Sequence, residues 1–234
     1  MILKTKQDAL HNKIMERAME LGYNSEEIAP ILDGVNCDRY VDAKLKILWV
    51  MKEPYDEIID GKPKGGGFAM YDYTVALPMF RTMAKIVYGI MNEKYYNEIP
   101  EPDEDMLKLL QSTAFINICK MPGYPSSSKE DLKHKLNEWQ DILQEQLDLY
   151  KPDIIILGNT YEELMEGKLN ENPCTDWRSD ASLPGKTAVL KNKYGQVIVD
   201  TFHPSPMRKC SRADLTDEVY INSIIHGVLT ALKD

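Results

Sequence analysis

Short, uninterrupted apolar runs alternate along the chain with longer segments in which apolar residues recur every three or four positions. The runs are KILWVM (46–51), TAFINI (113–118), DIIILG (153–158) and the end of TAVLKNKYGQVIVDTF (187–202). The beginning of the last segment predicts a further strand, which a turn at Lys193-Tyr194-Gly195 joins to the fourth apolar strand. A short run without polar alternation is typical of a strand that is covered on both faces. The pattern predicts an α/β fold: a three-layer α/β/α sandwich with a central, mainly parallel four-stranded sheet.

Helical periodicity marks five main segments, which are 6–21, 76–92, 103–111, 128–150 and 215–232. Asn24 or Ser25 is placed to cap a further short helix that runs to Ile31, and another short helix is predicted after Gly158. The helix at 6–21 and the short helix that runs to Ile31 both precede the first strand. We therefore predict an N-terminal helical extension at 1–43, followed by one globular domain at 44–234.

Polar side chains follow three of the predicted strands. In parallel sheets the chemistry lies at the carboxyl ends of the strands, which makes Glu53, Asn117 and His203 candidates. Glu53 suits the activation of a water molecule, Asn117 the donor and acceptor edge of a pyrimidine, and His203 a hydrogen bond to a developing anion. The structural alternatives are a surface turn, a loop cap and a histidine bonded to a neighbouring loop.

The segment FHPSPMRK (202–209) combines a stiff turn with positive charge. Pro204 and Pro206 restrict the turn, and Ser205 between them can donate to a phosphate. Met207 follows, flanked by two cations, Arg208 and Lys209. An apolar tip beside cations suits a wedge that enters a base stack, and the alternative for Met207 is ordinary core packing.

Composition excludes several classes of protein. The four cysteines are scattered, which is against a zinc ribbon or an iron–sulfur cluster. Gly185-Lys186-Thr187 lacks the first glycine of a phosphate-binding loop, because that position is Asp180. No apolar run reaches membrane-spanning length, and the N-terminus lacks the features of a signal peptide, so we expect a soluble, cytoplasmic protein without a membrane partner.

Taken together and in this order, the motifs resemble the uracil-DNA glycosylase superfamily. KILWVMKEPY resembles the family's first motif, FINICK its asparagine-bearing strand, KPDIIILGNTYEE its later glycine-ended strand, and FHPSPM its second catalytic motif. The resemblance spans roughly residues 44 to 232. It implies a base-excision repair enzyme that flips a nucleotide out of DNA and hydrolyses the N-glycosidic bond of uracil or a related damaged base.

The resemblance also implies a role for each matching residue. Glu53 would activate water, and His203 would stabilise the leaving base anion. Asn117 would read the base, Phe68 would stack on it, and Tyr55 would exclude the thymine methyl group. A last group would contact DNA, and its members are Ser205, Met207, Arg208 and Lys209.

No metal or other cofactor and no obligate protein partner is implied. The expected partner is single- or double-stranded DNA with a flipped pyrimidine. If DNA is the substrate, one cationic patch should surround the strand ends. Its expected members are Lys52, Lys62, Lys64, Lys120, Arg208, Lys209 and Arg212.

The chain departs from the family pattern at several positions. Met51 stands where the family has glycine, Glu53 is longer than the Asp of the best-known branch, and Asp56 replaces a histidine. The net charge of −9 is acidic for a DNA enzyme. Two alternatives therefore stay open: an inactive module of the same fold that binds nucleotides or nucleic acid, and a hydrolase of small nucleosides.

Overall fold

The computed structural model describes most of the 234-residue chain. The described residues are 2–23, 29–53, 58–59, 62–63, 77–123, 129–166, 176–178, 187–192, 194–206 and 214–233. Among them, no helix has the length and apolar character that crossing a bilayer requires.

The core of the fold is a mixed sheet in which seven described strands lie in the order β1-β5-β2-β6-β9-β8-β7. Its four central strands are parallel: β5 (Ala114–Asn117), β2 (Ile47–Met51), β6 (Ile154–Gly158) and β9 (Val197–Thr201). All four were predicted from their apolar runs, and every residue of β2, β5 and β6 is buried.

The prediction of a four-stranded sheet is wrong in extent, because antiparallel strands extend both edges. β1 (Gly34–Val35) pairs with β5, while β8 (Ala188–Lys191) pairs with β9 and with β7 (Asp176–Arg178). β1 and β7 are too short to give a hydrophobic pattern of their own. A separate antiparallel pair joins β3 (Ile58–Ile59) and β4 (Lys62–Pro63).

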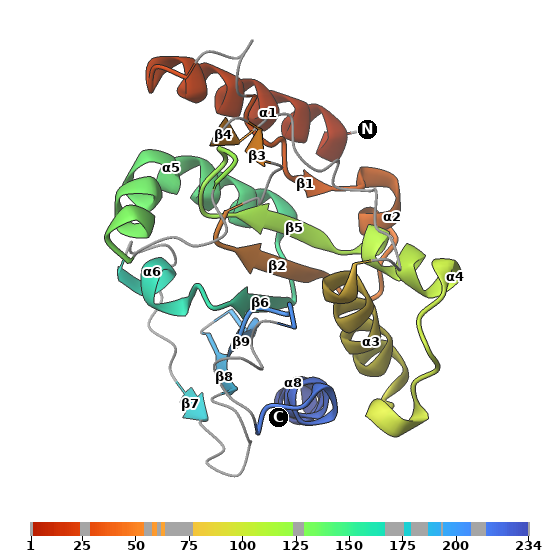
Figure 1. Ribbon diagram of the computed structural model, residues 1–234. Coiled ribbons are helices and arrows are strands. Elements are labelled where there is room, and N and C mark those ends of the chain that lie inside the picture. Colours follow the sequence, from red (N-terminus) through yellow and green to blue (C-terminus); the bar gives the residue numbers. More distant parts are fainter. Residues whose placement is uncertain are drawn as a thin grey trace.

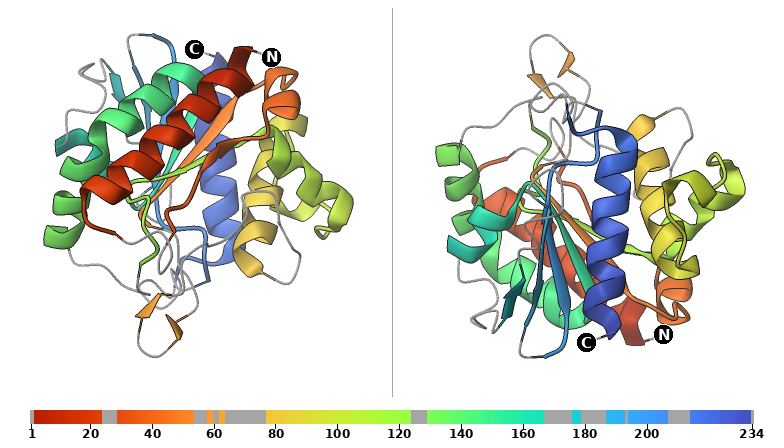
Figure 2. Two further views of the ribbon diagram at one scale, coloured as in Figure 1. Left: turned by 90° about the horizontal axis from the view of Figure 1, so that it is seen from above. Right: turned by 90° about the horizontal axis from the view of Figure 1, so that it is seen from below.

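Helices cover both faces of the sheet (Figure 1). One face carries α1 (Ile2–Glu20), α5 (Lys129–Tyr150) and α6 (Tyr161–Glu166), and the other carries α3 (Pro78–Asn92) and α8 (Asp217–Lys233). The two further views in Figure 2 show α1 and α8 on opposite sides of the strands. The shorter elements are α2 (Cys37–Val41), η1 (Tyr96–Glu98), α4 (Glu104–Leu107) and η2 (Lys108–Ser112).

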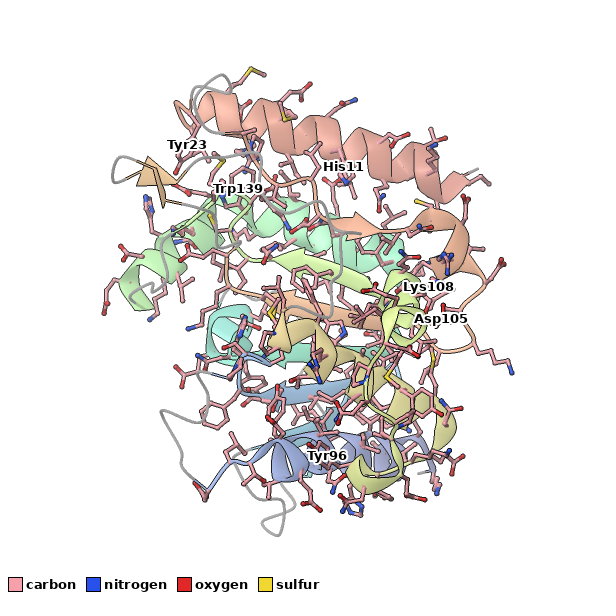
Figure 3. All side chains as sticks on the ribbon, turned by 45° about the vertical axis from the view of Figure 1, so that its right-hand side comes forward. His11, Tyr23, Tyr96, Asp105, Lys108 and Trp139 are labelled. Atoms are coloured by element: carbon pink, nitrogen blue, oxygen red, sulfur yellow. The ribbon has the colours of Figure 1, made fainter. Side chains whose placement is uncertain are left out.

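Two apolar cores lie on the two faces of the sheet. Trp49 of β2 is fully buried in the core against α3 and α8. Trp139 of α5 is fully buried in the opposite core, and Tyr23, just after α1, packs against the same core (Figure 3). Strands that are covered on both sides need apolar residues at every position, which explains why the central strands show no alternation.

The segment predicted as an N-terminal extension packs against the rest of the protein. Ile14 and Ala18 of α1 are buried in the core that contains Trp139. Arg17 donates to Asp141 of α5 at 2.8 Å, and β1 belongs to the sheet. The division of the chain at residue 43 stays a prediction, while the contacts show that its first part supports the sheet.

The connections after β2 and β5 leave in opposite directions. The chain reaches α3 on one face after β2, and it reaches α5 on the other face after β5. β2 and β5 are neighbours in the sheet. In open α/β sheets, ligands bind outside the carboxyl ends of the strands at such a switch point. We therefore expect a binding site at the carboxyl ends of β2 and β5.

Candidate functional site at the carboxyl edge of the sheet

The four central strands end side by side at what we call the carboxyl edge, formed by Met51, Asn117, Gly158 and Thr201. Met51 is the register partner of Asn117, and Gly158 is that of Thr201. Residues that follow these four positions are therefore neighbours in space although they come from four distant parts of the chain.

Glu53 lies two residues beyond the end of β2, and its side chain is only 6% exposed. Lys135 of α5 donates a short hydrogen bond to Glu53 Oε2. Gly123 lies against the same carboxylate, since a Cβ atom built on that glycine would overlap with it. Glu53 is thus a buried, ion-paired carboxylate, and not the surface turn residue of the structural alternative.

Three ionisable groups lie near this carboxylate. Burial lowers the pKa of Lys135, but the hydrogen bond to Glu53 and the nearby negative groups outweigh that effect, so its pKa is raised. Burial raises the pKa of the Cys119 thiol to about 11, and it also raises the pKa of the Tyr23 phenol. Around Glu53, the lysine is therefore charged at neutral pH while the thiol and the phenol are neutral.

Asn117 ends β5 and is 3% exposed. Its backbone N–H donates to Asp33 Oδ2 at 2.6 Å, and its amide Nδ2 donates to the same oxygen at 3.3 Å. Asp33 precedes β1, which pairs with β5 along the edge of the sheet. The asparagine therefore has a buried polar partner from the N-terminal part of the chain.

Lys120 is fully buried beside Asn117, together with Asp33 and Gln146. Its ammonium donates to both oxygens of Asp33 at 2.9 Å, to the Asn117 carbonyl at 2.7 Å and to Gln146 Oε1 at 2.7 Å. The expectation that Lys120 belongs to an exposed cationic patch is wrong. A fully buried ammonium needs an anion and several acceptors, and this cluster supplies both.

His203 follows β9 and is half-buried. The backbone N–H of Ser205 donates to His203 Nδ1 at 3.2 Å. An Nδ1 atom that accepts a hydrogen bond carries no proton, so in the neutral ring the proton resides on Nε2. The turn between the two prolines thus selects the tautomer of the histidine.

Met51 connects β2 to the histidine turn. A Cβ atom on Gly158 would overlap with Met51 Sδ, and it would lie 3.6 Å from Pro204 Cδ. The glycine at the end of β6 therefore makes room for the methionine, and Pro204 packs beside both. This contact brings the turn that holds His203 across β6 toward the end of β2.

A pocket of about 300 Å³ lies beside the same turn and was not predicted from the sequence. It lies between the first turns of α3 and α8, and Pro206 is part of its wall. At this pocket the Lys85 ammonium donates a hydrogen bond to Glu101 Oε1 at 2.7 Å, and it lies 4.6 Å from the centre of the Tyr96 ring. Figure 3 shows Tyr96 beside α8, where its backbone N–H donates to Asn222 at 2.8 Å.

Four predicted site residues, Glu53, Asn117, His203 and Ser205, are described, and they gather at the carboxyl edge. The other five lie outside the described residues: Tyr55, Phe68, Met207, Arg208 and Lys209. The same is true of Lys64 and Arg212 from the expected cationic patch. Within the described ranges, no group of three or more His, Cys, Asp or Glu residues is arranged to hold a metal ion.

Sequence reasoning missed the partners of the candidate residues. Lys135 pairs with Glu53 across 82 positions of the chain, and Lys120 pairs with Asp33 across 87. No local pattern marks such pairs. The available signal was weaker: Lys135 lies near the start of α5, and Lys120 lies three residues after the end of β5.

No family model and no curated protein sequence matches the chain. Among solved structures, the crystal structure of mimivirus uracil-DNA glycosylase is similar to 70% of this chain, with 16% sequence identity and a TM-score of 0.33. The matched part covers 51% of that chain, so this protein is similar to about half of the length of the viral enzyme.

Proposed function

We propose that the protein is a DNA base-excision glycosylase that hydrolyses the N-glycosidic bond of uracil or a related damaged base. One observation carries the proposal: a buried carboxylate, a buried amide and a histidine with a defined tautomer meet at the carboxyl edge. They are Glu53, Asn117 and His203. The edge includes the switch point of the sheet, where ligands bind in folds of this class.

The reaction needs opposite charges at the two ends of one bond. As the bond between sugar and base breaks, the sugar becomes cationic and the base becomes anionic. The Glu53 carboxylate favours the cation and orients a water molecule toward it. The Nε2–H of His203 donates to the oxygen of the departing base, which is the place where negative charge develops.

Access to the bond requires that the nucleotide leave the base stack, at a cost of a few kcal/mol. Ser205 in the rigid turn, with Arg208 and Lys209, is proposed to hold the phosphates. Met207 is proposed to fill the gap in the stack. Tyr55 and Phe68 are proposed to line the base pocket together with Asn117.

A cleavage assay tests the proposal directly. The native protein is incubated with short DNA that contains one uracil, in single- and double-stranded form, and free uracil is measured by mass spectrometry. We expect release of uracil, and no release of thymine from the matched thymine DNA. Absence of release from both uracil substrates contradicts uracil excision, and other damaged bases would then be tested.

Two contacts at the edge favour a second candidate, a binding module without hydrolysis. Lys135 neutralises much of the charge of Glu53, and the side chain of Met51 lies beside Gly158 at the end of the neighbouring strand. The ion pair reduces what the carboxylate can contribute to bond cleavage, and the methionine side chain takes up space at the strand ends. Binding of uracil-containing DNA without release of any base would support this second function.

Gly123→Ala should lower uracil release by about tenfold to a hundredfold, because misplacing a catalytic group by 1 Å has an effect of that size. The added Cβ atom would occupy the place of the Glu53 carboxylate. The end of a flexible side chain can move, so we expect only a small change in melting temperature. Initial rates and thermal melts of the variant and the native protein measure the two effects.

The matched control is the double variant Glu53→Asp with Gly123→Ala. Aspartate is one methylene shorter and leaves room for the alanine methyl group. The Gly123→Ala substitution should therefore have a smaller effect in the Glu53→Asp background than in the native protein. Equal effects in both backgrounds would show that Gly123 does not act through the carboxylate.

A further inference from the structure

The amide of Asn117 is held by one carboxylate that receives five hydrogen bonds. Asp33 Oδ2 accepts from the backbone N–H, from the side-chain Nδ2 of Asn117 and from Lys120. Asp33 Oδ1 accepts from Lys120 and from Gln146, at 2.9 Å and 2.8 Å. All of these groups are buried, so the arrangement has little freedom to change.

The bonds to Asp33 distinguish the two ends of the asparagine amide. A side-chain amide can be turned by half a rotation, which exchanges its carbonyl oxygen and its nitrogen. In the observed orientation the nitrogen faces the carboxylate. In the other orientation the carbonyl oxygen would face it, and two acceptors would meet without a proton between them inside the protein.

Lys120 and Gln146 keep Asp33 in the role of an acceptor. The Lys120 ammonium donates to both carboxylate oxygens of Asp33 at 2.9 Å, so both oxygens act as acceptors. Gln146, from α5, donates its amide to Asp33 Oδ1, and its own oxygen accepts from Lys120. The cluster thus holds the Asp33 oxygens in place as acceptors, and Asp33 fixes the orientation of the amide.

The orientation matters because the two pyrimidine edges are opposites. Uracil presents a ring N–H beside a carbonyl, which is an imide edge. Cytosine presents a bare ring nitrogen beside an amino group, which is an amidine edge. An asparagine that turns freely can pair with either edge, whereas one that is held in a single orientation pairs with only one.

The side-chain oxygen of Asn117, Oδ1, lies on the opposite side of the amide group from Asp33. No described residue donates a hydrogen bond to Asn117 Oδ1, and Nδ2 has a second hydrogen besides the one that faces Asp33. Asn117 Oδ1 is not among the fully buried polar atoms that lack a partner, so it keeps contact with solvent and a ligand can reach it. An acceptor beside a donor is complementary to an imide edge.

We propose that Asp33 is a positioning residue that locks the Asn117 amide and thereby makes the site select bases with an imide edge over bases with an amidine edge. This inference rests on the proposed function, because it concerns the base that the same site reads. Lys120 contributes by donating to both oxygens of Asp33.

A binding experiment measures the selection without any bond cleavage. The probes are short DNAs with one 2′-fluoro-2′-deoxyuridine or one 2′-fluoro-2′-deoxycytidine, in which fluorine slows cleavage of the glycosidic bond. The native protein should bind the uridine probe about tenfold or more tightly than the cytidine probe. Asp33→Asn with Lys120→Met removes both charges of the pair together and should bring the two affinities to within about threefold of each other.

Tyr40→Phe is the control for loss of a buried polar contact. It removes the hydrogen bond from Tyr40 to the Tyr150 carbonyl, in which neither Asp33 nor Asn117 takes part, and should leave the preference unchanged. A folded double variant that keeps the native preference overturns the inference. Equal affinity of the native protein for the two probes also overturns it but leaves the proposed function standing, whereas binding of neither probe overturns the proposed function itself.

A second measurement uses only the native protein and does not depend on DNA. Nuclear magnetic resonance of the Asn117 side-chain amide should show one set of signals, with one proton shifted downfield by the carboxylate and slow exchange with water. Two sets of comparable intensity would show that both orientations are populated. That result overturns the lock even if the double variant does not fold.

Discussion

Lys120→Met alone should lower the free energy of unfolding by about 3 to 5 kcal/mol, the usual cost of removing one partner from a buried ion pair. The substitution leaves the Asp33 carboxylate buried without its counter-charge. The Asn117 backbone carbonyl and Gln146 Oε1 also lose the hydrogen bonds that they accept from Lys120. Burial lowers the pKa of the Lys120 ammonium, and Asp33 offsets only part of that effect. The pair is therefore costly to bury and more costly to break. Urea unfolding monitored by circular dichroism measures the loss.

Two control variants make this result specific. Lys13→Met removes an exposed partner of Glu145 and should cost less than about 1 kcal/mol. Asp33→Asn combined with Lys120→Met leaves no buried charge, so it should be more stable than Lys120→Met by itself. A single variant as stable as the double variant would mean that the pair contributes no electrostatic coupling.

Glu53→Gln and His203→Ala should each lower the rate of uracil release by about 10² to 10³. Glutamine keeps the shape of the side chain but loses the negative charge that stabilises the cationic sugar. Alanine removes the Nε2–H donor whose position the Ser205 backbone N–H helps to set. Single-turnover rates at saturating enzyme measure the chemical step without product release.

The chain contains matched surface residues for both substitutions. Glu145→Gln changes an exposed carboxylate that pairs with Lys13, and His134→Ala changes an exposed histidine on α5. Both should retain the native rate. If Glu53→Gln or His203→Ala also retains the native rate while the native enzyme is active, the corresponding catalytic role is rejected.

Much of the fold was predictable because it depends on short-range patterns. The four central strands and the long helices α1, α3, α5 and α8 follow from apolar runs and helical periodicity. The short edge strands were not predictable in this way. Two residues, as in β1, carry no periodicity, and they become a strand only because β5 offers unpaired backbone groups beside them.

In the candidate site, too, some residues were predictable from local sequence patterns and others were not. Glu53, Asn117 and His203 could be named from the sequence because each follows an apolar strand, and strand ends have a defined place in a parallel sheet. Their partners were unpredictable. Lys120 lies three residues after β5. A lysine is almost never fully buried unless it is paired, so only the position of Asp33 explains its burial.

The layered architecture, the central strands and the candidate residues at their ends follow from the sequence, because periodicity is a property of neighbouring positions. Which charges are paired became visible in the three-dimensional structure alone. In that structure Lys135 pairs with Glu53, Asp33 accepts hydrogen bonds from Asn117, and Lys120 is fully buried. Burial and pairing depend on residues more than 80 positions apart in the chain, as the separations of 82 and 87 show, and such distances leave no mark on a local pattern.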